Sequence, residues 1–363
     1  MRSATASRKK AIIVKLGQIG DVIMTIPAVK TLHEQGYDID WVVGRAARPL
    51  LECYSWIRVI PVDDKAIFAG SFFERVKAIL CFWSIVISTR YEMCATLYYD
   101  SRFRILTLPI RARRKFSLSR RSNRTRELLP GRSHTDEFVR LLGGKQDTCG
   151  EQSVSPLRPD KLPSSRLPLK SASRRVAMVP GGAANLVRKQ GLRRWPIENY
   201  VTLATELVAR CWEVVLLGGP EDSELSEHFE RLTVTNCIGR LSLPEVISVC
   251  DSCDAVVSHD TGPLHLAGLS KSCLVGIFGP TDPAMFLPRR SFVAGIWGGQ
   301  GLACRPCYDG TNFAPCGFNA CMHQVTVEMV LVELDRLLSA RSVGASSPWR
   351  FVMPTDNEIS CTL

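Results

Sequence analysis

Short apolar runs alternate with segments of helical periodicity along most of this chain. The runs at 11–16, 39–43 and 59–62 are rich in Ile and Val, which predicts buried strands. Between the first two runs, apolar residues recur at helical spacing, with Pro27 as an expected kink: Val22, Ile23, Ile26, Val29 and Leu32. Strands that alternate with helices predict a parallel sheet with helices on both faces.

The same alternation continues in the second half of the chain after a break. A strand at 91–99 and a helix at 135–142 are expected, and the segment 145–175 then becomes rich in Pro, Ser and charge. Further strands are predicted at 176–179, 214–217, 255–258 and 273–278. Trp195-Pro196 and the capping-box spacing of Ser242 and Glu245 mark helix starts, and the last helix is expected at 326–339.

These patterns predict an α/β protein with two doubly wound, Rossmann-like domains. We place the N-terminal domain at 1–150, a linker at 151–175, the C-terminal domain at 176–340 and a tail without an assignable pattern at 341–363. Ligands of open parallel sheets bind at the carboxyl ends of the strands, so the expected site is a cleft between the two domains. No dinucleotide-binding glycine fingerprint follows the first strand, and no Walker A sequence is present, which argues against oxidoreductases and kinases.

The segment 254–268 has the pattern of a strand that feeds a helix through a tight turn. Thr261-Gly262-Pro263 breaks the apolar run, and Pro263 suits the first turn of a helix. Free backbone N–H groups at such a turn form an anion site. Asp260 and His265 flank it as an acceptor and a donor, although a helix cap and a structural histidine are the alternatives for these two residues.

Charge and cysteine content narrow the class of partner. The 363-residue chain carries a formal charge of +11, and the segment 102–132 holds eleven Lys or Arg and one acid, Glu127. Such a block suggests a phosphorylated substrate, an anionic membrane surface or nucleic acid. Because no nucleic-acid-binding module and few aromatic residues accompany it, we expect no nucleic acid partner, and a solvated basic loop stays an alternative.

Nothing in the sequence predicts export or membrane insertion. The first ten residues are polar and basic without a signal-peptide core, and the longest apolar run, 78–88, is too short to span a bilayer. We expect that run to be a core helix or strand, with an interfacial segment as the second interpretation. A cytoplasmic location is therefore expected, and the 14 cysteines should be reduced thiols or ligands.

Four motifs give the chain a family resemblance. They are the opening 17–28 (Gly-Gln-Ile-Gly-Asp-Val-Ile-Met-Thr-Ile-Pro-Ala), Val179-Pro-Gly-Gly182 with Arg193-Arg-Trp-Pro196, the stretch 215–222, and 258–265 with 278–283. In this order and spacing the chain resembles glycosyltransferase family 9, the heptosyltransferases of lipopolysaccharide core assembly. The resemblance implies a fold of the GT-B type, a nucleotide-sugar donor such as ADP-heptose, inversion at the anomeric carbon and no cofactor.

The resemblance also implies roles for individual residues. Asp21 matches the general base, for which a helix N-cap is the structural alternative; a helix N-terminus should keep its carboxylate ionised. The residues that correspond to the donor site are Gly181, Gly182, Arg193, Glu221, Asp260, Thr261, Gly262 and His265. Arg193 stands where the family usually has Lys, and an insertion-like stretch at 185–192 precedes it, so Lys189 and Arg194 are alternatives for the phosphate contact.

Partners and alternatives follow from the same resemblance. The expected partners are a nucleotide-sugar donor and a lipid-linked anionic glycan acceptor, with peripheral contact to the inner face of the membrane. Another nucleotide sugar or acceptor, and a non-catalytic nucleotide-sugar-binding paralogue, are the competing hypotheses. Cys304, Cys307, Cys316 and Cys321 have spacing close to that of a structural zinc site; we expect reduced thiols and no catalytic metal, with zinc as the alternative.

Overall fold

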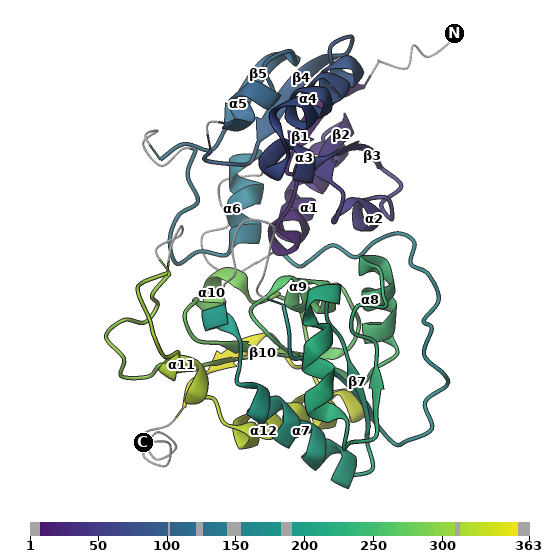
Figure 1. Ribbon diagram of the computed structural model, residues 1–363, viewed down its shortest axis with the longest axis vertical. Helices are drawn as coiled ribbons and strands as arrows, with labels where there is room; N and C mark the ends of the chain where they lie inside the picture. The colour runs from purple at the N-terminus through teal and green to yellow at the C-terminus, as the bar shows by residue number, and fades with distance from the viewer. Residues whose placement is uncertain are drawn as a thin grey trace. The chain divides into compact units, whose positions relative to one another are not determined.

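The computed structural model divides into two compact units, which the ribbon in Figure 1 traces from purple to yellow. Unit 1 comprises residues 1–161 and unit 2 residues 162–363. The structure describes residues 8–100, 102–120, 126–143, 154–182, 191–308 and 313–354. Within these ranges no helix is long and apolar enough to cross a bilayer.

Unit 1 is built on a parallel sheet. Its strands, in the order β3-β2-β1-β4-β5 across the sheet, are β1 (Lys9–Val14), β2 (Tyr37–Gly44), β3 (Ile57–Val62), β4 (Arg90–Thr96) and β5 (Arg111–Ser117). Its helices are α1 (Ile19–Glu34), α2 (Arg48–Leu51), α3 (Asp64–Ala69), α4 (Phe72–Val86), α5 (Arg102–Leu106) and α6 (His134–Leu141). The apolar residues predicted to line α1 are all buried, and Pro27 lies inside that helix.

Unit 2 repeats the architecture with more strands. They run β12-β11-β10-β9-β6-β7-β8 across a parallel sheet and are β6 (Arg175–Val179), β7 (Glu213–Leu216), β8 (Val234–Asn236), β9 (Ala255–His259), β10 (Cys273–Phe278), β11 (Val293–Trp297) and β12 (Arg350–Val352). Its helices are η1 (Gly191–Arg193), α7 (Ile197–Ala209), η2 (Pro220–Phe229), α8 (Leu243–Asp251), α9 (Gly262–Gly268), α10 (Pro283–Phe286), α11 (Ala320–His323) and α12 (Val327–Ser342).

Two helices of unit 2, α7 and α8, begin where the sequence predicts them. Trp195 is buried and donates its indole N–H to the carbonyl of Val325, and α7 starts two residues later. Ser242 forms a capping box with Glu245 at the start of α8. The tail, for which no pattern was assigned, contributes strand β12 to the sheet edge beside β11.

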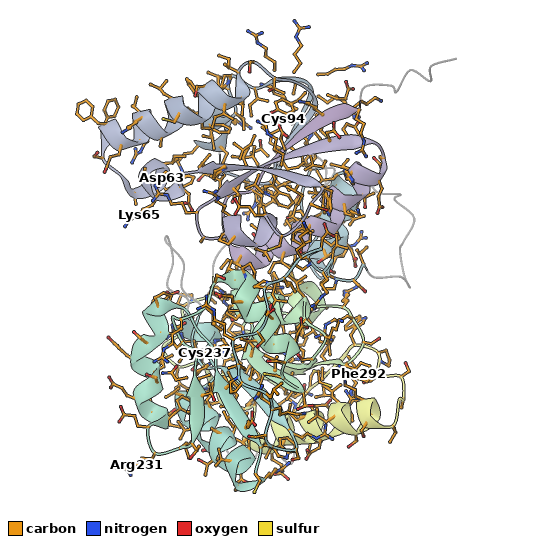
Figure 2. The ribbon with its side chains drawn as sticks, turned by 90° about the vertical axis from the view of Figure 1, so that its right-hand side faces the viewer. Asp63, Lys65, Cys94, Arg231, Cys237 and Phe292 are labelled. Atoms are coloured by element: carbon orange, nitrogen blue, oxygen red, sulfur yellow. The ribbon has the colours of Figure 1, made fainter. Side chains whose placement is uncertain are left out.

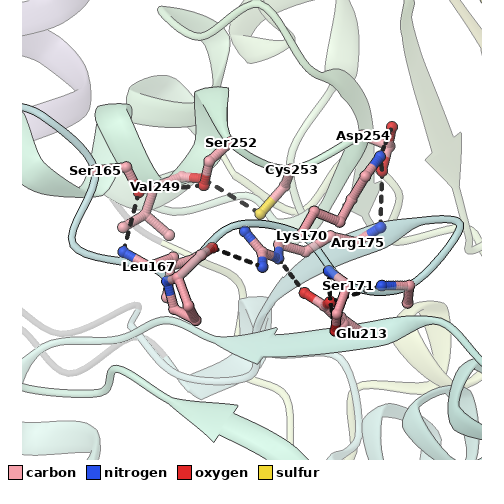
Figure 3. Close-up of polar contacts among 12 residues, drawn as sticks. Ser165, Leu167, Lys170, Ser171, Arg175, Glu213, Val249, Ser252, Cys253 and Asp254 are labelled. Carbon is pink, nitrogen blue, oxygen red and sulfur yellow. Dashed lines mark hydrogen bonds and ion pairs between the residues drawn. The ribbon is translucent and has the colours of Figure 1, made fainter.

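The chain boundary between the units falls at 161–162, inside the segment 151–175. On the unit 1 side, Asp160 accepts hydrogen bonds from the backbone and hydroxyl of Ser55 at 2.8 and 2.7 Å. On the unit 2 side, Figure 3 shows Lys170 bound to Asp254, and Glu213 bound to Ser171 and Arg175. Each half of this segment is therefore fixed to its own unit by side-chain contacts.

Two expectations for unit 1 were incomplete. The run 78–88 is the expected helix over 78–86, the second half of α4, but only one face of it joins the core: Phe82 and Val86 are buried, and most of the run is exposed. The stretch that follows α5, where no strand was predicted, forms the edge strand β5. Four of the seven residues of β5 are Arg or Lys, so its pairing is carried by the backbone rather than by an apolar face.

Candidate functional site

The strand order of unit 2 reverses between β6 and β9, which are hydrogen-bonded neighbours at the centre of the sheet. Gly181 and Gly182 follow β6, while Asp260, Thr261 and Gly262 follow β9. Open parallel sheets bind their ligands outside the carboxyl ends of the strands at this reversal. The sheet topology therefore brings most of the residues predicted for the donor to one place.

Arg193 and Asp260 form an ion pair at this reversal. The guanidinium Nη1 of Arg193 lies 3.3 Å from Oδ2 of Asp260, and the hydroxyl of Thr281 donates to the same oxygen at 2.7 Å. The Asp260 side chain is 3% exposed, so its charge requires a cationic partner. The Nε atom of Arg193 is also buried, and it has no hydrogen-bond partner among the described residues. One N–H of this cation is thus unpaired within the described ranges.

Arg194 is engaged differently from its neighbour. Its Nε and Nη2 atoms donate to the carbonyl of Gly182 at 2.9 and 2.7 Å, and Nη2 lies 3.4 Å from Asp222. The guanidinium of Arg194 therefore stabilises the glycine turn at Gly182. Lys189, the other alternative for the phosphate contact, lies outside the described residues, as does most of the predicted insertion 185–192.

Asp222 is a residue whose role the sequence did not predict. Its buried carboxylate accepts from the backbone N–H of Gly182 at 2.8 Å and of Gly219 at 2.9 Å, which joins the turns after β6 and β7. A Cβ atom at Gly181 would lie 2.2 Å from its Cγ, so only glycine fits there. Gly182 has a φ of +88°, which also favours glycine. Asp222 fixes the shape of the predicted donor turn.

The remaining predicted donor residues lie in two settings. Thr261 is the N-cap residue of α9, and its hydroxyl donates to the carbonyl of His259 at 3.3 Å. Gly262 begins α9, and His265 is buried on that helix. Glu221 is exposed at the start of η2 beside Gly219. The structure thus groups Thr261, Gly262 and His265 on one short segment and places Glu221 on another.

The charge at this end of the sheet affects His259, the last residue of β9. Burial, followed by the nearby charges of Arg193 and Arg194, lowers the pKa of His259 to about 3. The imidazole is therefore neutral at physiological pH, and its Nδ1 atom lies 2.9 Å from the hydroxyl of Tyr200. A neutral His259 adds no charge to the Arg193 and Asp260 pair.

In unit 1 the strand order reverses between β1 and β4, and Asp21 lies at that point. Its Oδ2 atom accepts a hydrogen bond from Nζ of Lys15 at 2.8 Å. Lys15 directly follows β1, is 3% exposed, and also lies 3.4 Å from the carbonyl of Leu97 beyond β4. The Asp21 side chain is 28% exposed, so a ligand can reach this carboxylate while its cation stays buried.

A tyrosine two residues beyond the end of β4 contacts the same segment. The hydroxyl oxygen of Tyr98 accepts from the backbone N–H groups of Leu16 and Gly17 at 2.8 and 3.1 Å. Nζ of Lys15 lies 4.4 Å from the centre of the Tyr98 ring. Burial, the largest single effect, lowers the pKa of Lys15, but the charge and hydrogen bond of Asp21 together with Tyr98 and Tyr99 outweigh it, so the pKa is raised. Lys15 therefore remains a cation beside Asp21.

The structure does not support the alternative role of Asp21 as a helix cap. The N-cap residue of α1 is Gln18, with a φ of 64°, and Asp21 is the third residue of the helix. The carboxylate is oriented by Lys15 instead. The sequence signal that could have indicated this contact is a lysine directly after the apolar run 11–14, six residues before Asp21.

The four cysteines near the C-terminus lie in a loop and a short helix, on either side of residues 309–312, which are not described. Among the described residues no group of three or more His, Cys, Asp or Glu side chains is placed to hold a metal ion. Burial, followed by the neighbouring thiols, raises the pKa of Cys307 and Cys321, the latter to about 11. This part of the structure offers the zinc alternative no support.

The basic block is distributed over α5, β5 and the segments that follow. Arg113 lies 3.2 Å from Glu92, Arg132 lies 3.0 Å from Glu137, and the guanidinium of Arg120 stacks on the ring of Tyr99. The five residues 121–125 of the block lie outside the described residues. The described part is an ordered, folded surface of unit 1.

Two Rossmann-like parallel sheets in one chain are the architecture of the GT-B fold, which the solved heptosyltransferase structures described below share. Residues 162–316 match the model of glycosyltransferase family 9 (heptosyltransferase). The chain therefore carries a family 9 domain and is a heptosyltransferase-like glycosyltransferase, which confirms the family resemblance, the fold class and the enzyme class that the sequence predicts.

Individual relatives agree with this assignment. The lipopolysaccharide core heptosyltransferase OpsX of Haemophilus influenzae is 25% identical over 303 residues, which cover 78% of this chain and 83% of that protein. The Escherichia coli ADP-heptose lipopolysaccharide heptosyltransferase II has the same fold, with a TM-score of 0.69 at 20% identity over 92% of this chain and 99% of the other. The E. coli heptosyltransferase WaaC with ADP gives a TM-score of 0.64 at 18% identity over 90% and 99% of the two chains.

Proposed function

We propose that this protein transfers a heptose from ADP-heptose to an anionic, lipid-linked lipopolysaccharide core acceptor, with inversion at the anomeric carbon. The observation that carries the proposal is the buried Nε atom of Arg193, which has no partner among the described residues at the strand reversal of unit 2. A diphosphate supplies the anion that such a group binds.

In this proposal the donor lies over the turns after β6 and β9. The guanidinium of Arg193, held by Asp260, contacts the diphosphate, and the backbone N–H groups of Thr261 and Gly262 add neutral donors. Gly181 and Gly182 permit close approach of the phosphates, His265 belongs to the same segment, and Glu221 would accept from a ribose hydroxyl. ADP is the proposed nucleotide because a relative of the same fold is described with ADP.

Asp21 is the proposed general base. It takes the proton of the acceptor hydroxyl while the acceptor oxygen bonds to the anomeric carbon and the bond from that carbon to the phosphate oxygen breaks, which releases ADP. Its ammonium partner Lys15 keeps the carboxylate oriented. A single substitution of this kind inverts the configuration and needs no second carboxylate as nucleophile.

The acceptor is proposed to bind unit 1, where the basic block lies. Phosphates on a lipopolysaccharide core would pair with its Arg and Lys side chains, and the lipid anchor would bring the enzyme to the inner face of the membrane. The names of similar proteins, such as the lipopolysaccharide core heptosyltransferase OpsX, support this class of acceptor.

Thermal denaturation in the presence of ADP, UDP or GDP tests the donor proposal. A ligand at about 100 times its dissociation constant adds about 2.7 kcal/mol to the free energy of unfolding. ADP should therefore raise the Tm by several degrees, and UDP and GDP should not. A response to UDP or GDP alone would move the proposal to another nucleotide sugar, and no response to any of the three would contradict it.

A further inference from the structure

Helix α4 of unit 1 carries an apolar stripe that no described part of the protein covers. Phe73, Val76, Leu80 and Ile87, just beyond the helix end, follow one another at spacings of three, four and seven residues, which places them on one face. Their exposed fractions are 82%, 37%, 54% and 47%. Figure 2 shows the side chains of α4 standing out from the helix along its length. The opposite face, with Phe82 and Val86, packs into unit 1.

A second exposed apolar segment adjoins this stripe. Ile105 in α5 and Leu108 just after it are 59% and 69% exposed. The indole N–H of Trp83 in α4 donates to the carbonyl of Leu106 at 3.0 Å, which fixes the two helices together. Eight of the fourteen exposed large hydrophobic side chains of the described residues lie within 72–87 and 105–108. Clustering of this kind marks a binding surface rather than scattered surface residues.

The surroundings of this surface are strongly cationic. The segment 70–117 contains nine Lys or Arg and three acids, Glu74, Glu92 and Asp100. Each acid already has an internal partner: Glu74 binds Ser71, Glu92 lies beside Arg113, and Asp100 lies beside Arg102.

Several of the cations are left without a counter-charge. Arg104, Arg111 and Lys115 are exposed and have no ion-pair partner within the described ranges. Arg104 lies in α5 beside Ile105, and Arg111 and Lys115 lie in β5, the strand that pairs with β4. The excess charge near the apolar surface is therefore positive, and these side chains can pair with an external anion.

We propose that the exposed face of α4, together with α5 and β5, binds an anionic lipid surface, with Phe73 and Leu80 inserted among the acyl chains and Arg104, Arg111 and Lys115 at the head groups. Apolar residues flanked by Lys and Arg are the composition of helices that lie in the plane of a membrane interface. The surface deepens the proposed function, because a lipid-linked acceptor is presented at a membrane.

A second copy of the chain fits this surface less well. In a twofold symmetric dimer the same patch meets itself, so the unpaired Arg and Lys residues of each copy would face one another. Like charges brought together in an interface oppose association. Negatively charged phospholipid head groups can pair with the cations, and the acyl chains can bury the apolar stripe.

Binding of the full-length chain to sedimented vesicles tests the proposal. The wild type should partition onto vesicles of equal parts phosphatidylcholine and phosphatidylglycerol, and not onto phosphatidylcholine alone. The double variant Phe73→Ser/Leu80→Ser should reduce that partition at least about tenfold, because each apolar side chain loses its transfer from water. The double variant Leu169→Ser/Val332→Ser removes two exposed apolar side chains of unit 2 and is the matched control, with no change expected.

A charge variant separates the two components of binding. Arg104→Gln/Arg111→Gln should weaken partition by about fivefold for each charge at low salt, and by less in high salt. Wild-type protein that ignores mixed vesicles, or a Phe73→Ser/Leu80→Ser variant that binds them as the wild type does, would overturn the proposal. A concentration-dependent dimer that this variant abolishes would overturn it in favour of self-association.

Transfer to a soluble, deacylated core acceptor is measured in parallel with the same variants. It should be unchanged in Phe73→Ser/Leu80→Ser, since neither residue belongs to the proposed catalytic machinery. If the wild type binds vesicles but transfers nothing, the proposed function fails and the lipid surface stands. If it transfers but binds no vesicles, the lipid surface alone is wrong.

Discussion

Replacement of Arg193 by Ala has two separable consequences. The first is structural: Asp260, 3% exposed, loses its cation and, among the described residues, keeps the hydroxyl of Thr281 as its side-chain donor. Removal of one partner of a buried ion pair costs about 3–5 kcal/mol. Because Arg193 itself is 20% exposed and water can enter the space it leaves, we expect a cost somewhat below this range, about 2–3 kcal/mol. For a unit of this size the Tm should fall by roughly 5–10 °C.

The second consequence is catalytic. Negative charge grows on the diphosphate as the bond to the sugar breaks, so the loss of a positioned donor should lower kcat by about 10²–10³-fold and raise the donor KM. Steady-state kinetics with ADP-heptose, normalised to the folded fraction, measure this effect. Arg193→Lys keeps the charge and should recover much of the activity. Arg231→Ala, at an exposed position of unit 2, is the control and should change neither quantity.

A double variant separates the two effects. Arg193→Ala/Asp260→Asn removes both charges and should restore most of the stability while kcat remains low. If Arg193→Ala lowers the Tm but leaves kcat and the donor KM per folded molecule at wild-type values, the pair is structural only. The phosphate contact then belongs to another cation, of which Lys189 and Arg194 are the alternatives.

Three further predictions concern positions outside the donor site. Lys15→Met should lower kcat by about 10–100-fold through loss of the oriented Asp21 carboxylate. The free energy of unfolding that Lys15 contributes, measured by urea denaturation, should be constant from pH 6 to 9. It should be lost above about pH 10.4, because the folded-state pKa of Lys15 is raised. Burial opposes ionisation of Glu213, but hydrogen bonds from Ser171, Ala172 and Arg175 outweigh it and lower its pKa to about 2. The destabilisation by Glu213→Gln should therefore be full above about pH 4.5 and vanish as the pH falls toward 2; a pH-independent difference would contradict the assignment. The third prediction concerns the thiols of Cys304, Cys307, Cys316 and Cys321. Elemental analysis should find well below about one equivalent of zinc, and chelation should leave the Tm unchanged. A stoichiometric metal whose removal lowers the Tm would instead favour a four-thiolate zinc site.

The sequence was most informative where local pattern and tertiary environment agree. The segment 255–268 has an apolar run, a glycine turn and Pro263 in the first turn, and the structure has β9 and α9 there. The capping box at Ser242 needs no tertiary partner and was predicted directly. Such elements can be predicted from local sequence, because the residues that start them and the residues that they bury lie close together in the chain.

The sequence was least informative where a contact joins distant segments or where burial is incomplete. The apolar run 78–88 has the composition of a core element, yet α4 exposes most of it, since composition does not say which face has a partner. Strand β5 has no apolar periodicity because it forms a sheet edge and pairs through its backbone. The ion pair of Arg193 with Asp260 and the bonds of Asp222 to two glycine turns join residues far apart in the sequence. Only the fold brings them together.

The contact between Lys15 and Asp21 changes what a substitution of Asp21 is expected to do. Asp21→Asn leaves a buried ammonium without its counter-charge, whereas Lys15→Met leaves a carboxylate that is 28% exposed. Buried charges cost more than solvated ones, so Asp21→Asn should destabilise unit 1 more than Lys15→Met does. Activity of the Asp21 variant must therefore be expressed per folded molecule.

Transfer of heptose from ADP-heptose to a soluble core acceptor, followed by mass spectrometry, tests the proposed function most directly. Wild-type protein should add one heptose per acceptor and release ADP. Asp21→Asn should do so with a kcat about 10²–10⁴-fold lower per folded molecule, with donor affinity nearly unchanged. No turnover by the wild type, or a kcat per folded molecule that Asp21→Asn leaves intact, would contradict Asp21 as the base of a heptosyl transfer.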